Sequence, residues 1–309
     1  MTKIRAVIDT DPGIDDAVAI LYALSSPAFE VLGLTTVAGN IGIATTTRNA
    51  GGLLALMGRA DVPVVAGAAA PLARKGYDAS DIHGNDGLGG VSLPAPLVSA
   101  SQGAVEWLAA LLRREPAGSV DVLALGPMTN IARLVREHPD AAARIGRLIA
   151  MGGVIHEAGN VGPRAEFNIA ADPEAAEIVL RAGLPMWLIP LDATRQVRAD
   201  APYLAALHAT GRPAGIATAE LVQAYFESTT VAGALASSRP LHDPCVMLLA
   251  ENPALFGCEP MGLSVDLSAG REAGTLSPDG AAPPVQVALR VDGAGALALL
   301  AAHLGRAAQ

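Results

Sequence analysis

The sequence predicts an α/β fold in which an open, mostly parallel, Rossmann-like sheet is flanked by helices, with additional helices toward the C-terminus. Short apolar runs typical of buried strands alternate with segments of helical periodicity along most of the chain. This βαβ order favours parallel strands with helices on both faces of the sheet. The 309 residues are 51% hydrophobic, which is ample for a sizeable core. Because no composition shift, internal repeat or low-complexity linker divides the chain, we expect one domain over residues 1–309.

The first strand and helix enclose a loop that is rich in aspartate. The apolar run at 4–8 predicts a strand, and the apolar residues within 17–24 fall on one face of a helix. The loop between them, 9–16 (DTDPGIDD), holds four aspartates, which would repel one another if nothing offset their charge. A helix N-terminus offsets one carboxylate, with Asp15 as the N-cap, but hardly four. A bound cation explains the cluster more simply, and oxygen ligands favour Ca²⁺ or Mg²⁺ over zinc.

Two other interpretations of this loop stay open, and a third fails. The loop is compatible with a capped turn whose aspartates are solvated. A strand followed by Asp9 and Asp11 is also typical of phosphatases that form an aspartyl phosphate, although Pro12-Gly13 and the second Asp pair fit that pattern poorly. An EF-hand is excluded, because Gly13 stands at loop position five rather than six and Ile20 stands at position twelve, where a glutamate is needed.

The remaining elements follow in the same alternating order. Residues 68–100 show no clear periodicity, and such a long irregular segment in a compact domain is often a functional loop. Residues 200–256 look mainly helical apart from a break at 237–244. We expect strands at 29–37, 62–66, 120–125, 148–151 and 185–191, strand-like runs at 262–267 and 285–291, and helices at 45–57, 102–114, after 130, at 172–181 with Asp172 as N-cap, and near 293–305.

Further polar side chains follow several of the predicted strands. Ligands of such sheets bind at the carboxyl ends of the strands. We therefore expect the loop 9–16, Asn40, the turn at Gly126 and the loop at Gly152 to lie close together. Singly, each signal has an ordinary structural explanation: a turn residue for Asn40, a surface position for His83, a solvated loop for 160–168, and an N-cap for Asp243 with Pro244 at N1.

Taken together, these stretches resemble the inosine–uridine-preferring nucleoside hydrolases. The loop 9–16 is similar to the N-terminal signature of that family, and the resemblance continues in order to about residue 250. The C-terminal sixth of the chain adds little to it. The other matching stretches are 38–40 (AGN), 125–130 (LGPMTN), 151–153 (MGG), 165–168 (AEFN), 172–176 (DPEAA) and 241–244 (LHDP).

The resemblance implies a Ca²⁺-dependent hydrolase that splits the N-glycosidic bond of ribonucleosides into ribose and free base, acting as a homodimer or homotetramer. By position, the calcium ligands are expected to be Asp11, Asp16, Asp243 and the backbone carbonyl of Leu125. The residues expected to hold the ribose hydroxyls are Asp15, Asn40, Asn160, Glu166 and Asn168, and His83, Met151 and Phe167 complete the expected substrate-binding set.

The residue types suit this chemistry. A calcium ion with seven or eight oxygen ligands can hold the ribose diol and an acidified water together, and Asp11 can take the proton of that water. His242 adjoins Asp243, and its ordinary pKa of about 6.5 suits protonation of the leaving base. Two rival functions remain: a ribose- or nucleoside-binding protein without catalysis, and an Mg²⁺-dependent phosphoryl-transfer enzyme that uses the Asp9/Asp11 pair, although no convincing phosphate-binding elements accompany that pair.

The base preference is the least determined property. Related enzymes often contact the base with an aromatic or amide side chain about a dozen residues before His242, and this chain has Thr230 near that position. The tryptophan that the purine-specific branch carries near the position of His83 is absent. We therefore expect inosine-type and uridine-type substrates, with pyrimidines favoured and modest selectivity.

Composition restricts the partners and the location. The net charge of −9 argues against a broad nucleic-acid or anionic-membrane surface. We expect no leader segment before the first strand, and no apolar stretch is long enough to span a bilayer. Cys245 and Cys258 are too far apart for a CxxC pair. We therefore expect a cytoplasmic protein without disulfides that binds a ribonucleoside and neither nucleic acid nor membrane.

Overall fold

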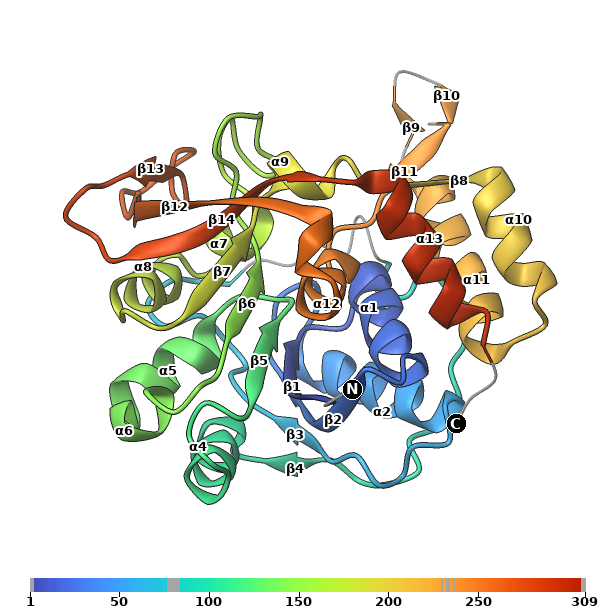
Figure 1. The fold of residues 1–309 in the computed structure, drawn as a ribbon, viewed down its shortest axis with the longest axis horizontal. Coiled ribbons are helices and arrows are strands. Elements are labelled where there is room, and N and C mark those ends of the chain that lie inside the picture. Colours follow the sequence, from blue (N-terminus) through green and yellow to red (C-terminus); the bar gives the residue numbers. More distant parts are fainter. Residues whose placement is uncertain (1–2, 77–83, 229, 232–233, 236, 307–309) are drawn as a thin grey trace.

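A ten-stranded sheet forms the centre of the protein. The computed structural model describes residues 3–76, 84–228, 230–231, 234–235 and 237–306, so His83 lies outside the described residues. The strand order is β13-β12-β14-β7-β6-β5-β1-β2-β3-β4, and Figure 1 shows the sheet from β13 at the upper left to β4 at the bottom. The strands are β1 (Ile4–Thr10), β2 (Phe29–Thr36), β3 (Val64–Ala66), β4 (Ser101–Gln102), β5 (Asp121–Ala124), β6 (Leu148–Met151), β7 (Met186–Ile189), β12 (Phe256–Val265), β13 (Leu276–Pro278) and β14 (Pro284–Val291).

The sheet is mostly parallel, as the sequence predicts. Every neighbouring pair from β14 to β4 is parallel, whereas β12 runs antiparallel to both β13 and β14. Two small antiparallel pairs lie apart from the sheet: β8 (Arg198–Asp200) with β11 (Ser238–Pro240), and β9 (Thr230–Val231) with β10 (Ala234–Leu235).

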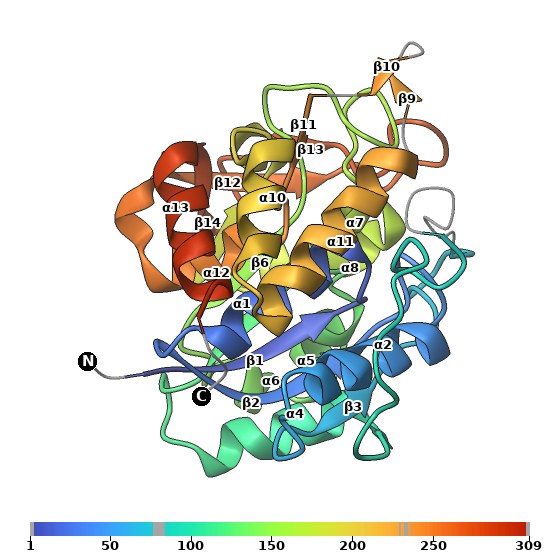
Figure 2. The ribbon, with the colours of Figure 1, turned by 90° about the vertical axis from the view of Figure 1, so that its right-hand side faces the viewer.

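Helices cover both faces of the sheet. Alternate residues of β1 point to opposite layers: Ile8 packs with α1, α11, α12 and α13, whereas Val7 packs with α4, α5 and α8. Figure 2 shows α10, α11 and α13 stacked in front of the sheet. The helices are α1 (Ile14–Ser25), α2 (Ile43–Leu56), α4 (Ala104–Arg114), α5 (Thr129–Glu137), α6 (Pro139–Ala142), α7 (Phe167–Ala171), α8 (Pro173–Arg181), α9 (Leu191–Thr194), α10 (Ala201–Ala209), α11 (Pro213–Ser228), α12 (Pro244–Glu251), the 3-10 turn η1 (Pro253–Leu255) and α13 (Gly293–Leu304). No helix among the described residues is long and apolar enough to cross a membrane.

Three local expectations need correction. The helix expected to continue to residue 256 ends at Glu251, because Pro253 stops it, and residues 256–262 pair with β14 instead. The N-cap of α1 is Gly13 rather than Asp15. Asp243 stands at the N-cap of α12 with Pro244 after it, but its side chain makes no capping hydrogen bond. The expected cap at Asp172 is confirmed, since its side chain accepts a hydrogen bond from the Ala175 N–H at 3.1 Å.

Candidate active site

The polar signals predicted from the sequence meet at one pocket. The loops after β1, β2, β5 and β6 contribute to it from the carboxyl ends of these strands, and the start of α12 contributes from above. Ten of the predicted site residues line this pocket, together with Val161 and Tyr225. The ten are Asp15, Asn40, Leu125, Met151, Asn160, Glu166, Phe167, Asn168, His242 and Asp243.

The aspartate-rich loop is built around the Asp16 carboxylate. Its Oδ1 accepts hydrogen bonds from Thr10 Oγ1 at 2.6 Å and from the Asp11 N–H at 3.2 Å. Its Oδ2 accepts from the Gly13 N–H at 3.1 Å and from Asn40 Nδ2 at 3.0 Å. Asp16 therefore folds the turn, satisfies a free N–H at the start of α1 and holds the neighbouring loop.

Asp11 lies beneath the pocket and is completely buried. Its Oδ2 accepts a hydrogen bond from the Asn40 N–H at 2.6 Å, whereas its Oδ1 has no hydrogen-bond partner among the described residues. Gly39 and Gly126 flank this carboxylate, and a Cβ at either position would overlap one of its oxygens. The backbone around Asp11 is thus shaped to admit the carboxylate and to leave one oxygen without a protein donor.

Asp9 is also buried, which overturns the interpretation of the loop as a turn of solvated aspartates. Its Oδ1 accepts hydrogen bonds from Thr35 Oγ1 at 2.5 Å and from Asn130 Nδ2 at 2.8 Å. Burial raises the pKa of Asp9 to about 6. Thr35 and Asn130 thus hold the Asp9 carboxylate inside the fold, and Asp9, like Asp11, is not among the residues that line the pocket.

Three carboxylates at the pocket floor form a group that could hold a metal ion. Ligand oxygens of Asp15, Asp16 and Asp243 all lie within 4.8 Å of one another, and the side chains of Asp16 and Asp243 share a hydrogen bond. Burial first, and then the charges of Asp15, Asp16 and Asp11, raise the pKa of Asp243 well above its ordinary value. Burial and the Asp16 charge likewise raise the pKa of Asp11.

This group fits a cation. Buried carboxylates are costly unless a positive charge offsets them, and none of the described residues that line the pocket is a lysine or arginine. The ligand roles predicted for Asp11, Asp16, Asp243 and the Leu125 carbonyl stay predictions. The compact group contains Asp15 in place of Asp11, and the Leu125 carbonyl accepts a hydrogen bond from Asn168 Nδ2 at 2.6 Å.

The opposite wall of the pocket is organised by Glu166. This side chain caps α7 by accepting hydrogen bonds from the N–H groups of Asn168 at 2.9 Å and Ile169 at 3.3 Å, and it also accepts from the Gly153 N–H at 2.8 Å. Burial raises the pKa of Glu166 to about 7 although these three donors oppose the rise. Asn160 lies at the rim, where its Oδ1 accepts a hydrogen bond from the Phe167 N–H at 2.9 Å.

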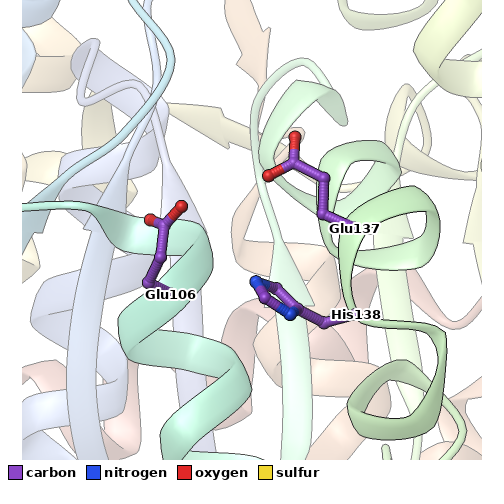
Figure 3. Close-up of side chains that lie close together, drawn as sticks. All are labelled: Glu106, Glu137 and His138. Atoms are coloured by element: carbon purple, nitrogen blue, oxygen red, sulfur yellow. The ribbon is translucent and has the colours of Figure 1, made fainter.

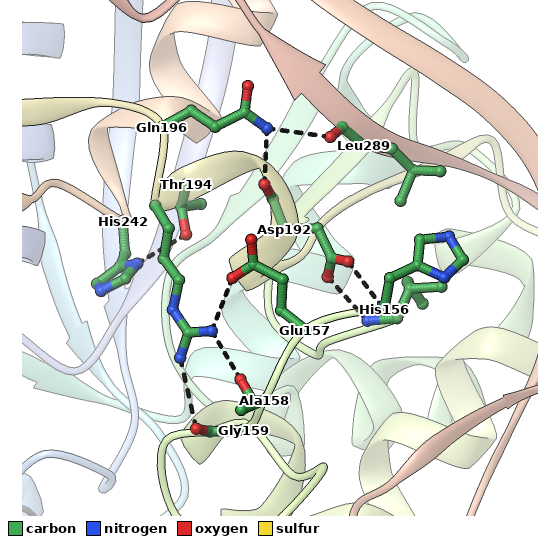
Figure 4. A network of polar contacts seen from close by, with 11 residues as sticks. His156, Glu157, Ala158, Gly159, Asp192, Thr194, Gln196, His242 and Leu289 are labelled. Carbon is green, nitrogen blue, oxygen red and sulfur yellow. Dashed lines mark hydrogen bonds and ion pairs between the residues drawn. The ribbon is translucent and has the colours of Figure 1, made fainter.

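His242 lines the pocket next to the carboxylates and is held from behind. Its Nδ1 and the Thr194 hydroxyl oxygen are 2.7 Å apart, and Thr194 is completely buried at the end of α9 (Figure 4). Thr194 therefore fixes the orientation of the imidazole ring in the pocket wall. The contact between Thr194 and His242 could not be predicted from the sequence, because the two residues are 48 positions apart and no motif links them.

Tyr225 lines the pocket although it is not among the predicted site residues. It lies on α11, and the guanidinium carbon of the buried Arg239 stands 5.2 Å from the centre of its ring. Burial raises the pKa of Tyr225 to about 12, so the phenol is neutral at physiological pH. The sequence signal for Tyr225 is its proximity to Thr230, which stands near the position where related enzymes contact the base. The side chain of Thr230 lies outside the described residues.

A second compact group of ligand-type side chains lies far from the pocket. Glu106 on α4, Glu137 on α5 and His138, which follows α5, bring their ligand atoms within 4.8 Å of one another (Figure 3). Both glutamates are exposed, and Arg133 forms an ion pair with Glu137 at 2.8 Å.

Comparisons with known proteins agree on one family. The sequence model described as "Inosine-uridine preferring nucleoside hydrolase" matches residues 6–298. The "Pyrimidine-specific ribonucleoside hydrolase RihA" of Salmonella gallinarum is 37% identical over 303 residues, which cover 96% of this chain and 97% of that protein. Among solved structures, a plant nucleoside hydrolase superimposes with a TM-score of 0.89 at 33% identity, covering 98% of this chain and 99% of the other. A "Purine-Preferring Ribonucleoside Hydrolase" from Gardnerella vaginalis gives a TM-score of 0.90 at 30% identity, with 97% and 98% covered.

Proposed function

The chain belongs to the inosine–uridine-preferring nucleoside hydrolase family, and from this premise we propose that it hydrolyses the N-glycosidic bond of ribonucleosides to ribose and free base with the help of Ca²⁺. The observation that carries the metal requirement is the group of buried carboxylates at the pocket floor, where Asp11 Oδ1 has no hydrogen-bond partner among the described residues. Oxygen ligands of this kind suit a hard cation.

Calcium would be held by Asp11, Asp16, Asp243 and the Leu125 carbonyl, with Asp15 close enough to contribute. When bound, it supplies positive charge that offsets the carboxylates and polarises the oxygens around it. In this proposal Asp11 accepts the proton of the attacking water, because its Oδ1 has no hydrogen-bond partner among the described residues and can act as the general base.

The ribose is positioned by the polar wall of the pocket. Asp15, Asn40, Asn160, Glu166 and Asn168 would bind its hydroxyls, and each of these residues lines the pocket. A site that dedicates buried polar groups to hydroxyls rejects a deoxy analogue strongly, because those groups would remain unpaired. We therefore propose ribonucleosides rather than deoxyribonucleosides as the substrate class.

His242 would protonate the departing base. The contact between its Nδ1 and the Thr194 hydroxyl fixes the orientation of the imidazole ring in the pocket wall. Met151 and Phe167 line the same pocket and supply apolar surface next to the sugar and base. His83, which we also place in the substrate-binding set, lies outside the described residues, so its role rests on the family resemblance.

For the base, we propose that uridine and inosine are both substrates and that uridine reacts faster. The Salmonella relative is named pyrimidine-specific, whereas the structural neighbour from Gardnerella is named purine-preferring. The pocket offers Tyr225 as an aromatic residue on α11, and it offers no lysine or arginine among its described lining residues. This composition suits a neutral nucleoside with modest selectivity for the base.

We also propose that residues 1–309 form one domain and that the protein works in the cytoplasm as a homodimer or homotetramer. The ten-stranded sheet contains strands from the first, middle and last thirds of the chain, which supports a single folding unit. Both cysteines are unpaired, which fits a reducing compartment. The oligomeric state rests on the family resemblance.

One experiment tests the proposed reaction. The protein is incubated with Ca²⁺ and a panel of uridine, cytidine, inosine, guanosine and their 2′-deoxy forms, and free base is measured by chromatography. We expect base release from ribonucleosides, fastest from uridine, and very little from the deoxy forms. Tight binding without base release would favour a ribose- or nucleoside-binding protein instead.

A further inference from the structure

Residues 155–161, here called the rim segment, carry two side chains of the pocket, Asn160 and Val161. Most of the segment is exposed: His156, Glu157 and Ala158 face solvent, and Asn160 is exposed as well. A segment with so few buried apolar side chains depends on polar contacts for its position.

Those contacts come from α9 and from the residue that follows it. The Asp192 carboxylate accepts hydrogen bonds from the N–H groups of Ile155 at 2.8 Å and His156 at 2.7 Å. Only 6% of Asp192 is exposed, so this contact is shielded from water. Figure 4 shows the Asp192 carboxylate facing the backbone of His156.

Arg195 continues the same pattern along the segment. Its Nη1 donates to Glu157 Oε2 at 2.8 Å and to the Ala158 carbonyl at 2.7 Å, and its Nη2 donates to the Gly159 carbonyl at 3.4 Å. Five consecutive residues, 155–159, are therefore each bound by Asp192 or Arg195. The next two residues, Asn160 and Val161, line the pocket.

The local turn leaves the Asn160 amide ready for a ligand. The Asn160 N–H donates to the Ala165 carbonyl at 3.0 Å, and its Oδ1 accepts from the Phe167 N–H. The two donors of Nδ2 have no partner among the described residues and lie in the pocket wall. The position of these donors relative to a substrate thus depends on how α9 holds the preceding five residues.

We propose that Arg195, together with Asp192, is a positioning residue for substrate binding: it sets the place of Asn160 in the pocket and thereby the affinity for the ribonucleoside, without touching the substrate itself. This inference rests on the proposed function. The two positioning residues are distinct from the carboxylates of the proposed metal site, since neither Asp192 nor Arg195 lines the pocket.

The test compares Arg195→Met with Arg113→Met. The control removes an arginine of the same kind, whose Nη2 pairs with Asp140 Oδ1 at 2.7 Å at the distant α4–α6 edge. For uridine with saturating Ca²⁺, we expect Arg195→Met to raise KM roughly tenfold, the effect of about one charge-assisted hydrogen bond. We expect kcat to stay within about twofold, because the variant changes how uridine is held rather than the groups that act on it. Arg195→Lys should recover part of the loss, and Arg113→Met should change neither constant.

Hydrogen exchange gives a second readout that does not need turnover. The amides of Gly159 and Asn160 should exchange faster in Arg195→Met than in the wild type and in Arg113→Met. An unchanged KM in an active Arg195→Met protein would overturn the inference and leave the proposed function intact. If the wild type released no base from any ribonucleoside, the proposed function would fail. Unchanged exchange at Gly159 and Asn160 would then overturn the inference independently.

Discussion

Two groups of ligand-type side chains among the described residues share a geometry but differ in burial and in how their charge is offset. In the pocket cluster, oxygens of Asp15, Asp16 and Asp243 approach one another within 4.8 Å, and the edge cluster of Glu106, Glu137 and His138 meets the same limit. Each cluster also has a histidine, because His242 adjoins Asp243 in the chain. Distance alone therefore does not distinguish a metal site from a crowded surface.

Burial and the compensation of charge do distinguish the pocket cluster from the edge cluster. A hydrogen bond from Arg133 lowers the pKa of Glu137, whereas burial and neighbouring carboxylates raise the pKa of Asp243. Water and Arg133 already offset the charge of the edge cluster, so a cation has little to add there. None of the described residues that line the pocket is a lysine or arginine, and the uncompensated charge of the pocket cluster is what indicates a bound ion.

The largest effect should come from Asp11→Asn, which keeps the size of the side chain beneath the pocket but removes its basicity. We expect turnover of uridine to fall roughly 10²- to 10⁴-fold, the range for the loss of a general base. Glu137→Gln at the edge cluster should leave turnover unchanged. Steady-state rates on both variants provide the measurement. Near-normal turnover in a folded, calcium-loaded Asp11→Asn protein would remove Asp11 from the reaction.

The two histidines give the next comparison. His242→Ala should slow uridine and inosine roughly 10²-fold, but should slow a riboside with an activated leaving group, such as p-nitrophenyl riboside, only slightly, because that group departs without a proton. His138→Ala should leave all three rates unchanged. Equal slowing of all three substrates by His242→Ala would mean that this side chain shapes the site rather than supplying a proton.

Calcium should stabilise the fold through the pocket cluster alone. A hundredfold excess of Ca²⁺ over its Kd is expected to raise the free energy of unfolding by about 2.7 kcal/mol. Asp243→Asn should abolish most of this gain, whereas Glu137→Gln should retain it. Thermal unfolding with Ca²⁺ and with a chelator measures both effects, and an equal gain in Asp243→Asn would place the ion elsewhere.

The gain from calcium should also depend on pH. Carboxylates whose pKa is raised by folding bind more protons in the folded protein than in the unfolded chain, so their contribution is present at low pH and is lost as pH rises through the raised values. For the calcium-free protein we expect a loss of stability from about pH 4 to beyond 7, the pKa of Glu166 being about 7. Calcium favours the ionised forms of Asp11 and Asp243, so the difference in Tm between calcium-bound and calcium-free protein should be larger at pH 8 than at pH 5. A difference that shrinks as pH rises would contradict this assignment.

The parts of this molecule that local sequence patterns determine could be predicted from the sequence. The strand at 4–8, the aspartate-rich loop after it and the cap at Asp172 follow from apolar runs, turn residues and N-cap chemistry that lie close together in the chain. The family resemblance added residues such as Asn160 and Glu166, which do line the pocket.

The features that could not be predicted from the sequence depend on tertiary contacts. The strand at 256–261 owes its conformation to pairing with β14, not to its own alternation. Thr194 meets His242 across 48 residues, and Arg195 binds backbone carbonyls 36 and 37 residues away. Backbone carbonyls carry no side-chain signature, so no motif could have identified Arg195 as the residue that holds the rim segment.

The smallest expected effect is that of Glu137→Gln on the free energy of unfolding. It tests the comparison of the two clusters most directly, because it concerns the edge cluster by itself. Glu137→Gln removes an exposed carboxylate and its pair with Arg133 one helical turn away. Such exposed pairs contribute about 0.3–0.5 kcal/mol, and the loss of repulsion between Glu137 and Glu106 works in the opposite direction. We therefore expect the free energy of unfolding to change by less than about 0.5 kcal/mol in chemical denaturation, with or without Ca²⁺. If Glu137→Gln instead lowered the stability only when Ca²⁺ was present, the edge cluster would bind the ion despite its exposure. Proximity of ligand-type side chains would then be sufficient for a metal site in this protein, and burial would no longer distinguish the pocket cluster from the edge cluster.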